Sequence, residues 1–331
     1  MSRKPRIDPV RWQPPPSRPL PPPDPTPELT VVEIPGNAPE DVVVDAEGTI
    51  WTGVEDGRII AVGPDSAPRV VTDTGGRPLG LAVTRDHRLL ICDSHRGLLR
   101  FDPAGGQLET LVDQVAGRTL TFCSNAVESS DGTIYFTEST DRFHYEYYKA
   151  SVIEARGSGS LMRLGTDGQV SMLASGLHFA NGVTLTADES AVVFAESTAR
   201  RLSKYWLTGP RTGTVTPLVT ELPGHPDNIS TGHDGRIWVA MVSDRNALAD
   251  WLSPRAPVLR SLLWRLLPYH WLPDVNSGAW VVGFDAQDGR VLSQFRSTDP
   301  RFGMATGVVE ADDRLWMGRI GGPGLAYFHL R

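Results

Sequence analysis

The chain has 331 residues, a formal net charge of −7, and 40% hydrophobic and 21% charged residues. This composition is typical of a globular protein with a sizeable core and excludes a largely disordered chain. The 32 Lys and Arg residues are scattered along the sequence, which excludes nucleic acid as the main partner. No apolar run has the length of a signal peptide or a membrane span, so we expect a cytoplasmic protein.

The chain begins with a proline-rich arm, residues 1–29. Its first 27 residues contain 11 of the 27 prolines, as in "QPPPSRPLPPPDPTP". Such a segment favours extended polyproline II structure. We expect the arm to lie along the following domain or to be free in solvent.

A repeat occupies residues 30–331. An acidic turn followed by an alternating strand occurs six times, as in "DAEGTIWTG", "SSDGTIYFTE" and "GHDGRIWVAM". The acidic turn residues are Glu47, Asp86, Asp131, Asp188, Asp234 and Asp312. Where no insertion intervenes they are spaced by about 40 to 45 residues, the period of a four-stranded propeller blade. Two longer steps indicate insertions at 139–159 and 243–278.

The two ends of the repeat region complete each other. The last repeat supplies only three strands, and "LTVVEIP" at 29–35 is a spare strand before the first repeat. Pairing them closes the ring and removes unpaired sheet edges. The sequence therefore predicts an all-β fold, a six-bladed β-propeller whose N-terminal strand closes the last blade.

Polar residues recur at the start of the first strand of each blade, which lines the central channel of a propeller. Counting back from the acidic turns gives one column: Glu40, Leu79, Asn125, Asn181, Asp227 and Ala305. Four of these side chains carry an oxygen, and Asn228 stands beside Asp227. Carboxylate and amide oxygens without His or Cys suit Ca²⁺ and disfavour zinc. For any one of these residues, turn formation is the simpler explanation, but four in one column favour a shared site.

The sequence resembles the strictosidine synthase-like branch of calcium-dependent six-bladed propellers. The resemblance rests on "APEDVVVDAEGTIWTGVEDGRI", "HRGLLRFDPAGG", "LHFANGVTLTADES" and "LPGHPDNIS", and covers about residues 30 to 331. A more remote similarity extends to paraoxonases, gluconolactonases and diisopropyl-fluorophosphatase. The resemblance implies a Ca²⁺ ion held by Glu40, Asn125, Asn181, Asp227 and Asn228. It also implies hydrolysis of small esters or lactones.

The chain departs from these relatives at two places. The histidine base of the paraoxonases would fall near Pro78 or Leu79, where no histidine stands. The catalytic glutamate of the condensing plant enzyme has no counterpart around Ala305, because Glu310 lies within the strand that follows. Condensation is thus disfavoured. A non-catalytic small-molecule-binding propeller with structural calcium is the main alternative to a hydrolase.

Three residues are candidates for the base that hydrolysis needs. Asp227 could act as ligand and as base or nucleophile. His178 and His225 precede Asn181 and Asp227 near the predicted channel mouth, although either imidazole could simply be part of the wall. An aromatic segment, "RFHYEYYKA" at 142–150, could form a wall over the same mouth or serve as loop packing.

The second insertion contains a predicted amphipathic helix within 254–272. Its apolar half consists of Val258, Leu259, Leu262, Leu263, Leu266 and Leu267. The opposite half consists of Arg260, Ser261, Trp264 and Arg265. A lid whose apolar half packs on the propeller is the ordinary interpretation. Contact with a membrane surface or an apolar substrate is the sharper one. The sequence does not indicate an oligomeric state.

Overall fold

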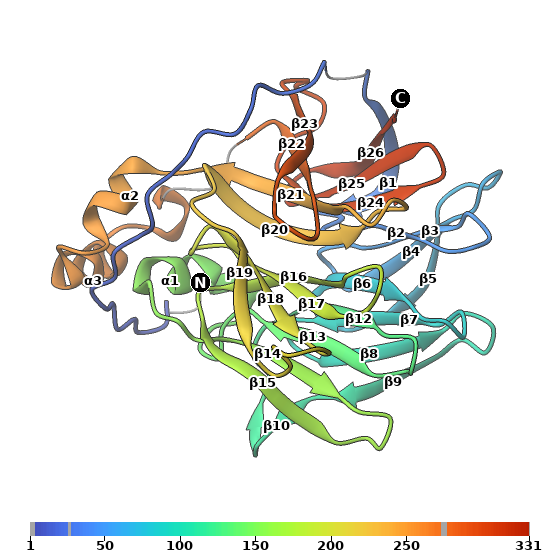
Figure 1. The fold of residues 1–331 in the computed structure, drawn as a ribbon, viewed down its shortest axis with the longest axis horizontal. Helices are drawn as coiled ribbons and strands as arrows, with labels where there is room; N and C mark the ends of the chain where they lie inside the picture. The colour runs from blue at the N-terminus through green and yellow to red at the C-terminus, as the bar shows by residue number, and fades with distance from the viewer. Residues whose placement is uncertain (1–3, 26–27, 273–276, 331) are drawn as a thin grey trace.

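The computed structural model describes residues 4–25, 28–272 and 277–330. Within these residues the strands form six four-stranded sheets and one small hairpin. Each four-stranded sheet is one blade, which confirms the predicted six-bladed β-propeller (Figure 1). Parts of the predicted arm and of the second insertion, residues 1–3, 26–27 and 273–276, lie outside the described residues, as does residue 331.

The first three blades follow one another along the chain. Blade 1 consists of β2 (Val43–Val44), β3 (Ile50–Gly53), β4 (Arg58–Val62) and β5 (Arg69–Asp73). Blade 2 consists of β6 (Pro78–Val83), β7 (Leu89–Asp93), β8 (Gly97–Asp102) and β9 (Gln107–Val112). Blade 3 consists of β12 (Cys123–Glu128), β13 (Ile134–Glu138), β14 (Gly159–Leu164) and β15 (Val170–Leu177). The hairpin of β10 (Gln114–Val115) and β11 (Arg118–Thr119) lies between blades 2 and 3 in the sequence.

The remaining blades include the one that closes the ring. Blade 4 consists of β16 (Ala180–Leu185), β17 (Ala191–Glu196), β18 (Arg201–Trp206) and β19 (Val215–Val219). Blade 5 consists of β20 (Gly224–Thr231), β21 (Ile237–Asp244), β22 (Ala279–Phe284) and β23 (Val291–Ser297). Blade 6 consists of β24 (Ala305–Ala311), β25 (Arg314–Arg319), β26 (Pro323–His329) and the N-terminal β1 (Thr30–Asn37). Because β1 pairs antiparallel with β26, the predicted closure of the last blade is confirmed.

The core lies between the faces of neighbouring blades. All residues of β16, β17 and β22 are buried, because blades cover both faces of these strands. Such strands therefore appear in the sequence as continuous apolar runs rather than as a strict alternation. Cys92 and Cys123 illustrate the arrangement: both are buried free thiols in one cluster shared by blades 2 and 3.

The acidic residues that revealed the repeat are turn residues. Asp131, for example, accepts hydrogen bonds from Ser129 Oγ at 2.6 Å and from the backbone N–H of Thr133 at 2.9 Å. Gly132 completes the turn with a positive φ of 84°, which favours glycine. These turns join the first and second strands, so they lie at the opposite end of the first strand from the polar column.

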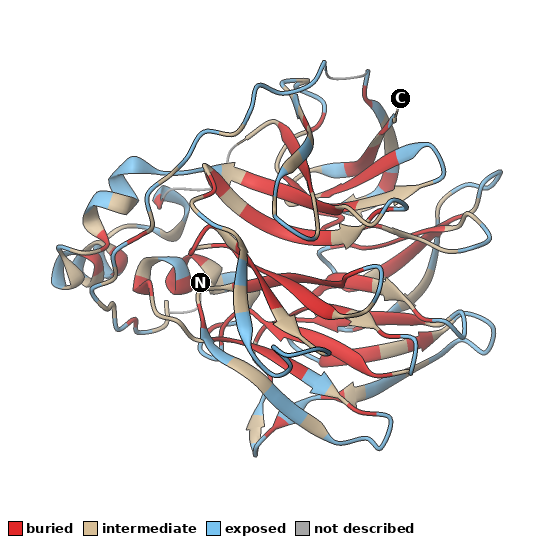
Figure 2. Ribbon diagram, viewed as in Figure 1, coloured by how far each residue is buried: buried red, intermediate tan, exposed pale blue. Residues whose placement is uncertain are grey.

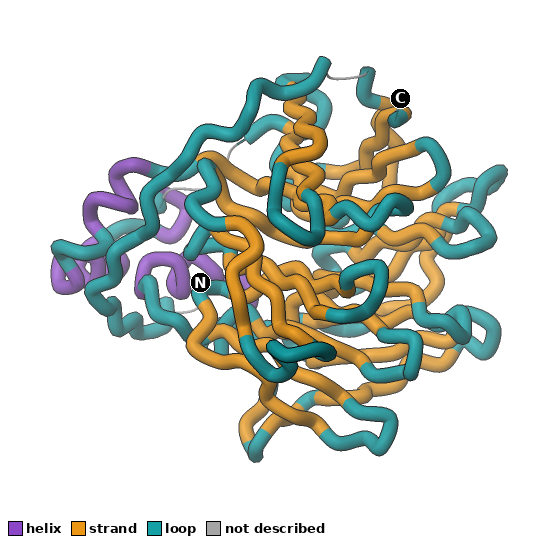
Figure 3. Tube along the Cα trace, in the orientation of Figure 1, coloured by secondary structure: helices purple, strands orange, loops and turns teal. Residues whose placement is uncertain are grey.

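Helices occur in the two insertions. The first contains η1 (Tyr145–Tyr147) and α1 (Tyr148–Glu154), and the second contains α2 (Ala247–Leu252), α3 (Pro257–Leu266) and η2 (Tyr269–Trp271). Figures 1 and 3 show these helices together at one end of the sheets. We call this group the helical cap. It has its own small core, in which Phe143, Ala150 and Trp264 are buried together with Ile7 of the arm.

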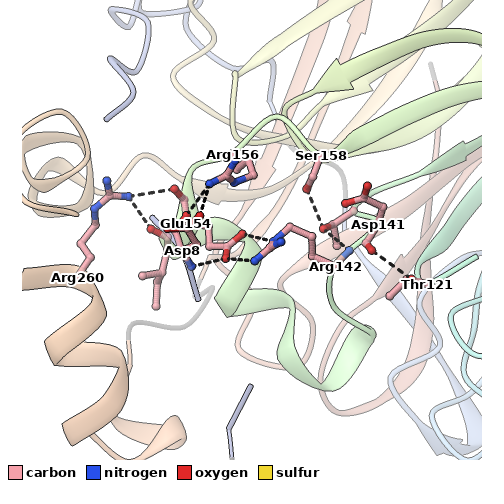
Figure 4. Close-up of polar contacts among 10 residues, drawn as sticks. Asp8, Thr121, Asp141, Arg142, Glu154, Arg156, Ser158 and Arg260 are labelled. Carbon is pink, nitrogen blue, oxygen red and sulfur yellow. Dashed lines mark hydrogen bonds and ion pairs between the residues drawn. The ribbon is translucent and has the colours of Figure 1, made fainter. Parts of the chain in front are cut away.

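The N-terminal arm lies on the helical cap and continues along blades 4 and 5. The backbone N–H of Asp8 donates to Glu154 Oε1 at 2.6 Å, and Glu154 forms an ion pair with Arg142 at 2.7 Å (Figure 4). Farther along, the N–H of Arg18 donates to the carbonyl of Glu221 at 2.7 Å. The arm is thus an ordered part of the domain surface over 4–25.

Helix α3 has the opposite orientation from that expected of a lid. Arg260 and Trp264 are buried toward the arm and α1, whereas the apolar residues Val258, Leu262 and Leu266 are exposed (Figure 2). The physical reason is the guanidinium of Arg260, which donates to the carbonyls of Ile153 and Val10 at 2.6 Å each. Among the described helices, none combines the length and the hydropathy that a membrane crossing requires.

Candidate functional site

The polar column predicted from the sequence converges at the central channel. Asn125 and Asn181 lie near the starts of β12 and β16, Asp227 and Asn228 lie in β20, and Glu40 precedes β2. All five side chains are buried, with at most 6% of their surface exposed. The structure thus brings together the five residues that the resemblance implied as Ca²⁺ ligands.

A bulge in the first strand of several blades directs these side chains. The pairing register shifts between Cys123 and Ala126, between Ala180 and Val183, and between Pro226 and Ile229. Each shift encloses the polar residue of its strand. A bulge adds an unpaired residue and turns its side chain away from the regular pleat, and bulges are frequent next to active sites. The sequence repeat gave no sign of these bulges.

Three carboxylates belong to the cluster, because Asp41 joins Glu40 and Asp227. Asp41 accepts hydrogen bonds from the backbone N–H groups of Val42 and Leu81, both at 2.9 Å, and from Asn125 Nδ2 at 3.5 Å. Asn228 Nδ2 donates to Glu40 Oε2 at 3.4 Å, and Asn181 Nδ2 donates to Asp227 Oδ1. Each carboxylate therefore has at least one asparagine amide as a donor.

Burial raises the pKa values of all three carboxyl groups. The pKa of Asp227 rises to about 8, chiefly through burial, with the charge of Asp41 adding to the shift and the Asn181 hydrogen bond opposing it. The pKa of Asp41 rises to about 6, again chiefly through burial. The pKa of Glu40 is raised by burial and then by the charges of Asp227 and Asp41. The cluster therefore favours a bound positive charge.

Arg77 and Tyr145 also lie beside these carboxylates. Arg77 was not assigned to the site from the sequence, and Tyr145 was included only as part of the aromatic segment 142–150. The buried Arg77 donates both Nη atoms to the carbonyl of Ala38 at 3.2 Å, and its guanidinium lies 4.7 Å from the ring centre of Tyr145. The charge of Arg77 lowers the pKa of Glu40, and burial raises the pKa of Tyr145. The aromatic insertion thus contributes Tyr145 to the site, whereas Phe143 is part of the cap core.

The two candidate histidines have different surroundings. His225 lies in β20, and its Nδ1 is 2.9 Å from the carbonyl of Ser197. The Ser197 hydroxyl donates to the carbonyl of Pro226 at 2.6 Å and accepts from Asn181 at 3.2 Å. Burial lowers the pKa of His225. This imidazole is therefore neutral at neutral pH and connects to the cluster through Ser197.

His178 lies against the arm. Its ring stacks on Trp12 with a centroid distance of 4.5 Å, and burial lowers its pKa. Its Nδ1 is buried and has no hydrogen-bond partner among the described residues. Among the residues that the structure describes, neither His178 nor His225 forms a hydrogen bond with Glu40, Asp41 or Asp227.

The donor set suits a hard cation. Among the described residues, no three His, Cys, Asp or Glu side chains form a group that could hold a metal by themselves. Carboxamide oxygens are therefore needed besides Glu40 and Asp227. A half-turn of the terminal torsions of Asn125, Asn181 and Asn228 exchanges their nitrogen and oxygen atoms. The set would then present only oxygen, as Ca²⁺ requires.

Two other features lie away from this cluster. Glu310, an acidic residue of β24 in the last blade, accepts from Trp238 Nε1 at 2.6 Å and lies 3.3 Å from His233. It has no such bond to the cluster in the described structure. A cavity of about 420 Å³ lies at the far ends of blades 3 and 4 and is lined by Asp131, Arg163 and Glu189 among others, so it is no part of the channel mouth.

Comparisons with known proteins agree with this architecture. Residues 38–249 match the family model described as SMP-30/Gluconolactonase/LRE-like region. Protein STRICTOSIDINE SYNTHASE-LIKE 6 of Arabidopsis thaliana is 31% identical and is aligned over 86% of this chain and 76% of its own length. Adipocyte plasma membrane-associated protein of Salmo salar is 30% identical over 85% of this chain and 73% of its own length.

Solved structures show the same fold. A gluconolactonase from Xanthomonas campestris matches with a TM-score of 0.62 and 20% identity over 98% of this chain and 88% of that chain. A calcium-binding protein, regucalcin, from Agrobacterium tumefaciens matches with a TM-score of 0.62 and 17% identity over 89% of this chain and 90% of that chain. The chain therefore belongs to the SMP-30/gluconolactonase/LRE-like family of six-bladed propellers, and its curated relatives include strictosidine synthase-like proteins.

Proposed function

We propose that the chain is a Ca²⁺-dependent hydrolase of small esters or lactones that acts at the mouth of the central channel. The observation that carries this proposal is the convergence of Glu40, Asp41 and Asp227, three buried carboxylates that each have an oxygen-bearing asparagine amide from another blade as a neighbour. Removing such groups from water is costly unless a cation is present. The family membership and the name of the regucalcin neighbour point in the same direction.

Glu40, Asn125, Asn181, Asp227 and Asn228 are the residues that would hold the ion. When bound, Ca²⁺ would supply a Lewis acid for the carbonyl oxygen of the substrate. Arg77 and Tyr145 lie beside the same carboxylates and would orient the polar end of the substrate. Burial of the cluster excludes bulk water, which strengthens each of these electrostatic interactions.

Two side chains are suited to remove a proton from the attacking water. Asp227 has a pKa of about 8 in the absence of a cation, and its ionised form is a proton acceptor within the cluster. His225 is neutral, and the Ser197 carbonyl favours a proton on its Nδ1, which leaves Nε2 as an acceptor. His178 is covered by Trp12, so we expect it to support the wall of the site.

Hydrolysis of phenyl acetate and of simple lactones, measured with Ca²⁺ and with EDTA, tests the proposal. Glu40→Gln and Asp227→Asn should each lower kcat/KM by about a hundredfold or more, the loss typical when an electrostatic group of an active site is removed. Asp65→Asn changes an exposed carboxylate and is the matched control. Calcium binding without any turnover of the panel would instead favour a non-catalytic binding propeller.

A further inference from the structure

The helical cap presents an apolar surface to solvent on its outer side. We call it the outer face of the cap and define it by Leu248, Trp251, Val258, Leu262, Leu266 and Trp271. Val258 is 83% exposed, and Leu266 and Trp271 are each 68% exposed. Aliphatic and tryptophan side chains this exposed, on the consecutive helices α2, α3 and η2, are typical of an interaction surface.

Hydrogen bonds from Arg260 and Trp264 orient α3 so that its apolar side chains are exposed. Arg260 donates to the carbonyls of Val10 and Ile153 at 2.6 Å and of Ser253 at 2.9 Å, and Trp264 Nε1 donates to the carbonyl of Pro5 at 2.8 Å. These bonds hold the polar side of the helix against the arm and α1, and Figure 4 shows Arg260 directed toward these neighbours. Turning the apolar side inward would break all of them, so Val258, Leu262 and Leu266 remain directed outward.

The segment that forms the outer face also contains several arginines. The segment 245–272 contains four arginines and one acidic residue, in a chain whose net charge is −7. Arg255 and Arg265 are exposed, and Arg265 follows Leu262 by three residues and Val258 by seven, about one and two helical turns, so all three lie on the same side of α3. The one acidic residue, Asp250, is held by Arg200 at 2.7 Å and by Arg245 at 3.1 Å. Its charge is therefore already compensated.

We propose that the outer face of the cap docks on a lipid bilayer with anionic headgroups. An amphipathic helix with leucines and tryptophans on one side and arginines at the margin lies in the plane of such an interface. Tryptophan is favoured at the boundary between headgroups and acyl chains, and arginine is attracted by anionic lipid. A second copy of the chain is a poorer occupant, because a twofold contact would bring Arg255 and Arg265 of both copies together.

Docking would place the channel mouth near the bilayer. The cap follows β21, and the end of β21 at Asp244 pairs with Gly224 at the start of β20, three residues before Asp227. Likewise, α1 follows β13, whose end at Glu138 pairs with Cys123, two residues before Asn125. The helical cap and the polar cluster thus share one end of the propeller, and Figure 1 shows the cap helices at one end of the sheets. A substrate that partitions into the bilayer would approach the mouth from the cap side.

Vesicle flotation of the full chain tests the proposal without any requirement for turnover. We expect the protein to float with vesicles of phosphatidylcholine mixed with phosphatidylglycerol, to float less with phosphatidylcholine alone, and to be released by salt. The triple variant Val258→Ser/Leu262→Ser/Leu266→Ser should lose at least about tenfold in the ratio of bound to free protein. Arg255→Ser/Arg265→Ser should weaken chiefly the preference for the anionic vesicles.

The control replaces exposed apolar residues elsewhere. Val70→Ser/Met172→Ser/Val215→Ser changes three exposed side chains on the outer strands of other blades and should float like the unmodified chain. Unchanged melting temperatures verify that each variant is folded. Failure of the unmodified chain to float with anionic vesicles would overturn the proposal, as would equal flotation of both triple variants. A dimer in solution that only the α3 triple variant dissociates would show that a second copy occupies the face instead.

Discussion

Asn181 donates its side-chain amide to the carboxylate of Asp227, and this bond joins blade 4 to blade 5 at the central channel. The same amide nitrogen lies 3.2 Å from Ser197 Oγ, and the side-chain oxygen of Asn181, Oδ1, accepts from Ser124 Oγ at 3.0 Å. Asn181 therefore connects the acidic cluster to two neighbouring hydroxyl groups. Even so, the pKa of Asp227 rises to about 8, because a single amide donor does not compensate for its burial.

Replacement of Asn181 by Ala should therefore destabilise the protein by about 1–3 kcal/mol, since it leaves buried polar groups without a partner. The loss should appear in the free energy of unfolding measured with urea in EDTA. Asn37→Ala is the control, because Asn37 is exposed and, among the described residues, its amide donates only to the exposed Glu55. Equal stability of the two variants would show that the Asn181 network contributes little.

The metal-free protein should lose stability as the pH rises. In the unfolded chain, aspartate titrates near pH 3.9, whereas Asp41 and Asp227 titrate at about 6 and about 8 in the folded chain. Between these values the folded state binds more protons than the unfolded state, so its stability falls with pH. Melting temperatures measured in EDTA should decline from about pH 7 to about pH 8, where the lowered pKa values of His178 and His225 no longer make the opposite contribution.

A variant isolates the contribution of Asp227 to this trend. Asp227→Asn cannot ionise, so in EDTA its melting temperature should decline less steeply and should exceed that of the unmodified chain at about pH 8. Added Ca²⁺ should raise the melting temperature of the unmodified chain most at the alkaline end. If the melting temperatures of the two proteins decline equally with pH in EDTA, the raised pKa of Asp227 is contradicted.

The attachment of the arm to the cap can be tested with two arginines of the same helix. Arg260→Ala should cost about 1–3 kcal/mol, because the carbonyls of Val10 and Ile153 lose a charged donor. Arg265→Ala, at an exposed position of α3, should change stability by less than about 0.5 kcal/mol. Limited proteolysis should cut the arm faster only in the Arg260 variant. Similar cleavage of both would mean that Arg260 does not hold the arm.

Trp12 should control the titration of His178. Trp12→Ala removes the ring that covers the imidazole, so the pKa of His178 should rise toward the usual value of a histidine near 6.5. Proton NMR titration of the His178 ring measures this directly. If the pKa stays depressed in the variant, burial by the propeller itself rather than by the arm lowers it.

The sequence predicted the architecture, and most of the residues that converge in the acidic cluster, because both depend on the repeat. Equivalent positions of a sixfold ring meet at its axis, so one column of residues was enough to bring Glu40, Asn181 and Asp227 together. The same counting omitted Asp41, although it stands beside Glu40. The backbone N–H groups of Val42 and Leu81 hold its carboxylate in the cluster, and the bond from Leu81 depends on the contact between blades 1 and 2.

Features outside the repeat were less accessible to prediction. Arg77 ends the connection before β6, and its contact with Tyr145 depends on an insertion whose course no periodicity constrains. The amphipathic pattern of α3 predicted a lid with Val258 and Leu262 inward, whereas in the structure these residues are exposed and Arg260 and Trp264 are buried. Arg265, assigned to the polar half, is exposed on the same side as the apolar residues. Arg260 faces inward because backbone carbonyls of the arm and α1 accept its donors, and hydrophobic periodicity contains no information on such bonds.

Calorimetric titration of Ca²⁺ into the metal-free full chain, together with Glu40→Gln, Asp227→Asn and the exposed control Asp65→Asn, tests the central claim most directly. We predict one site in the unmodified chain and in the control, and at least about a tenfold loss of affinity in each cluster variant, because each removes one charged ligand. Absence of binding to the unmodified chain, or equal affinity in all four proteins, would contradict the assignment of the channel cluster as a calcium site.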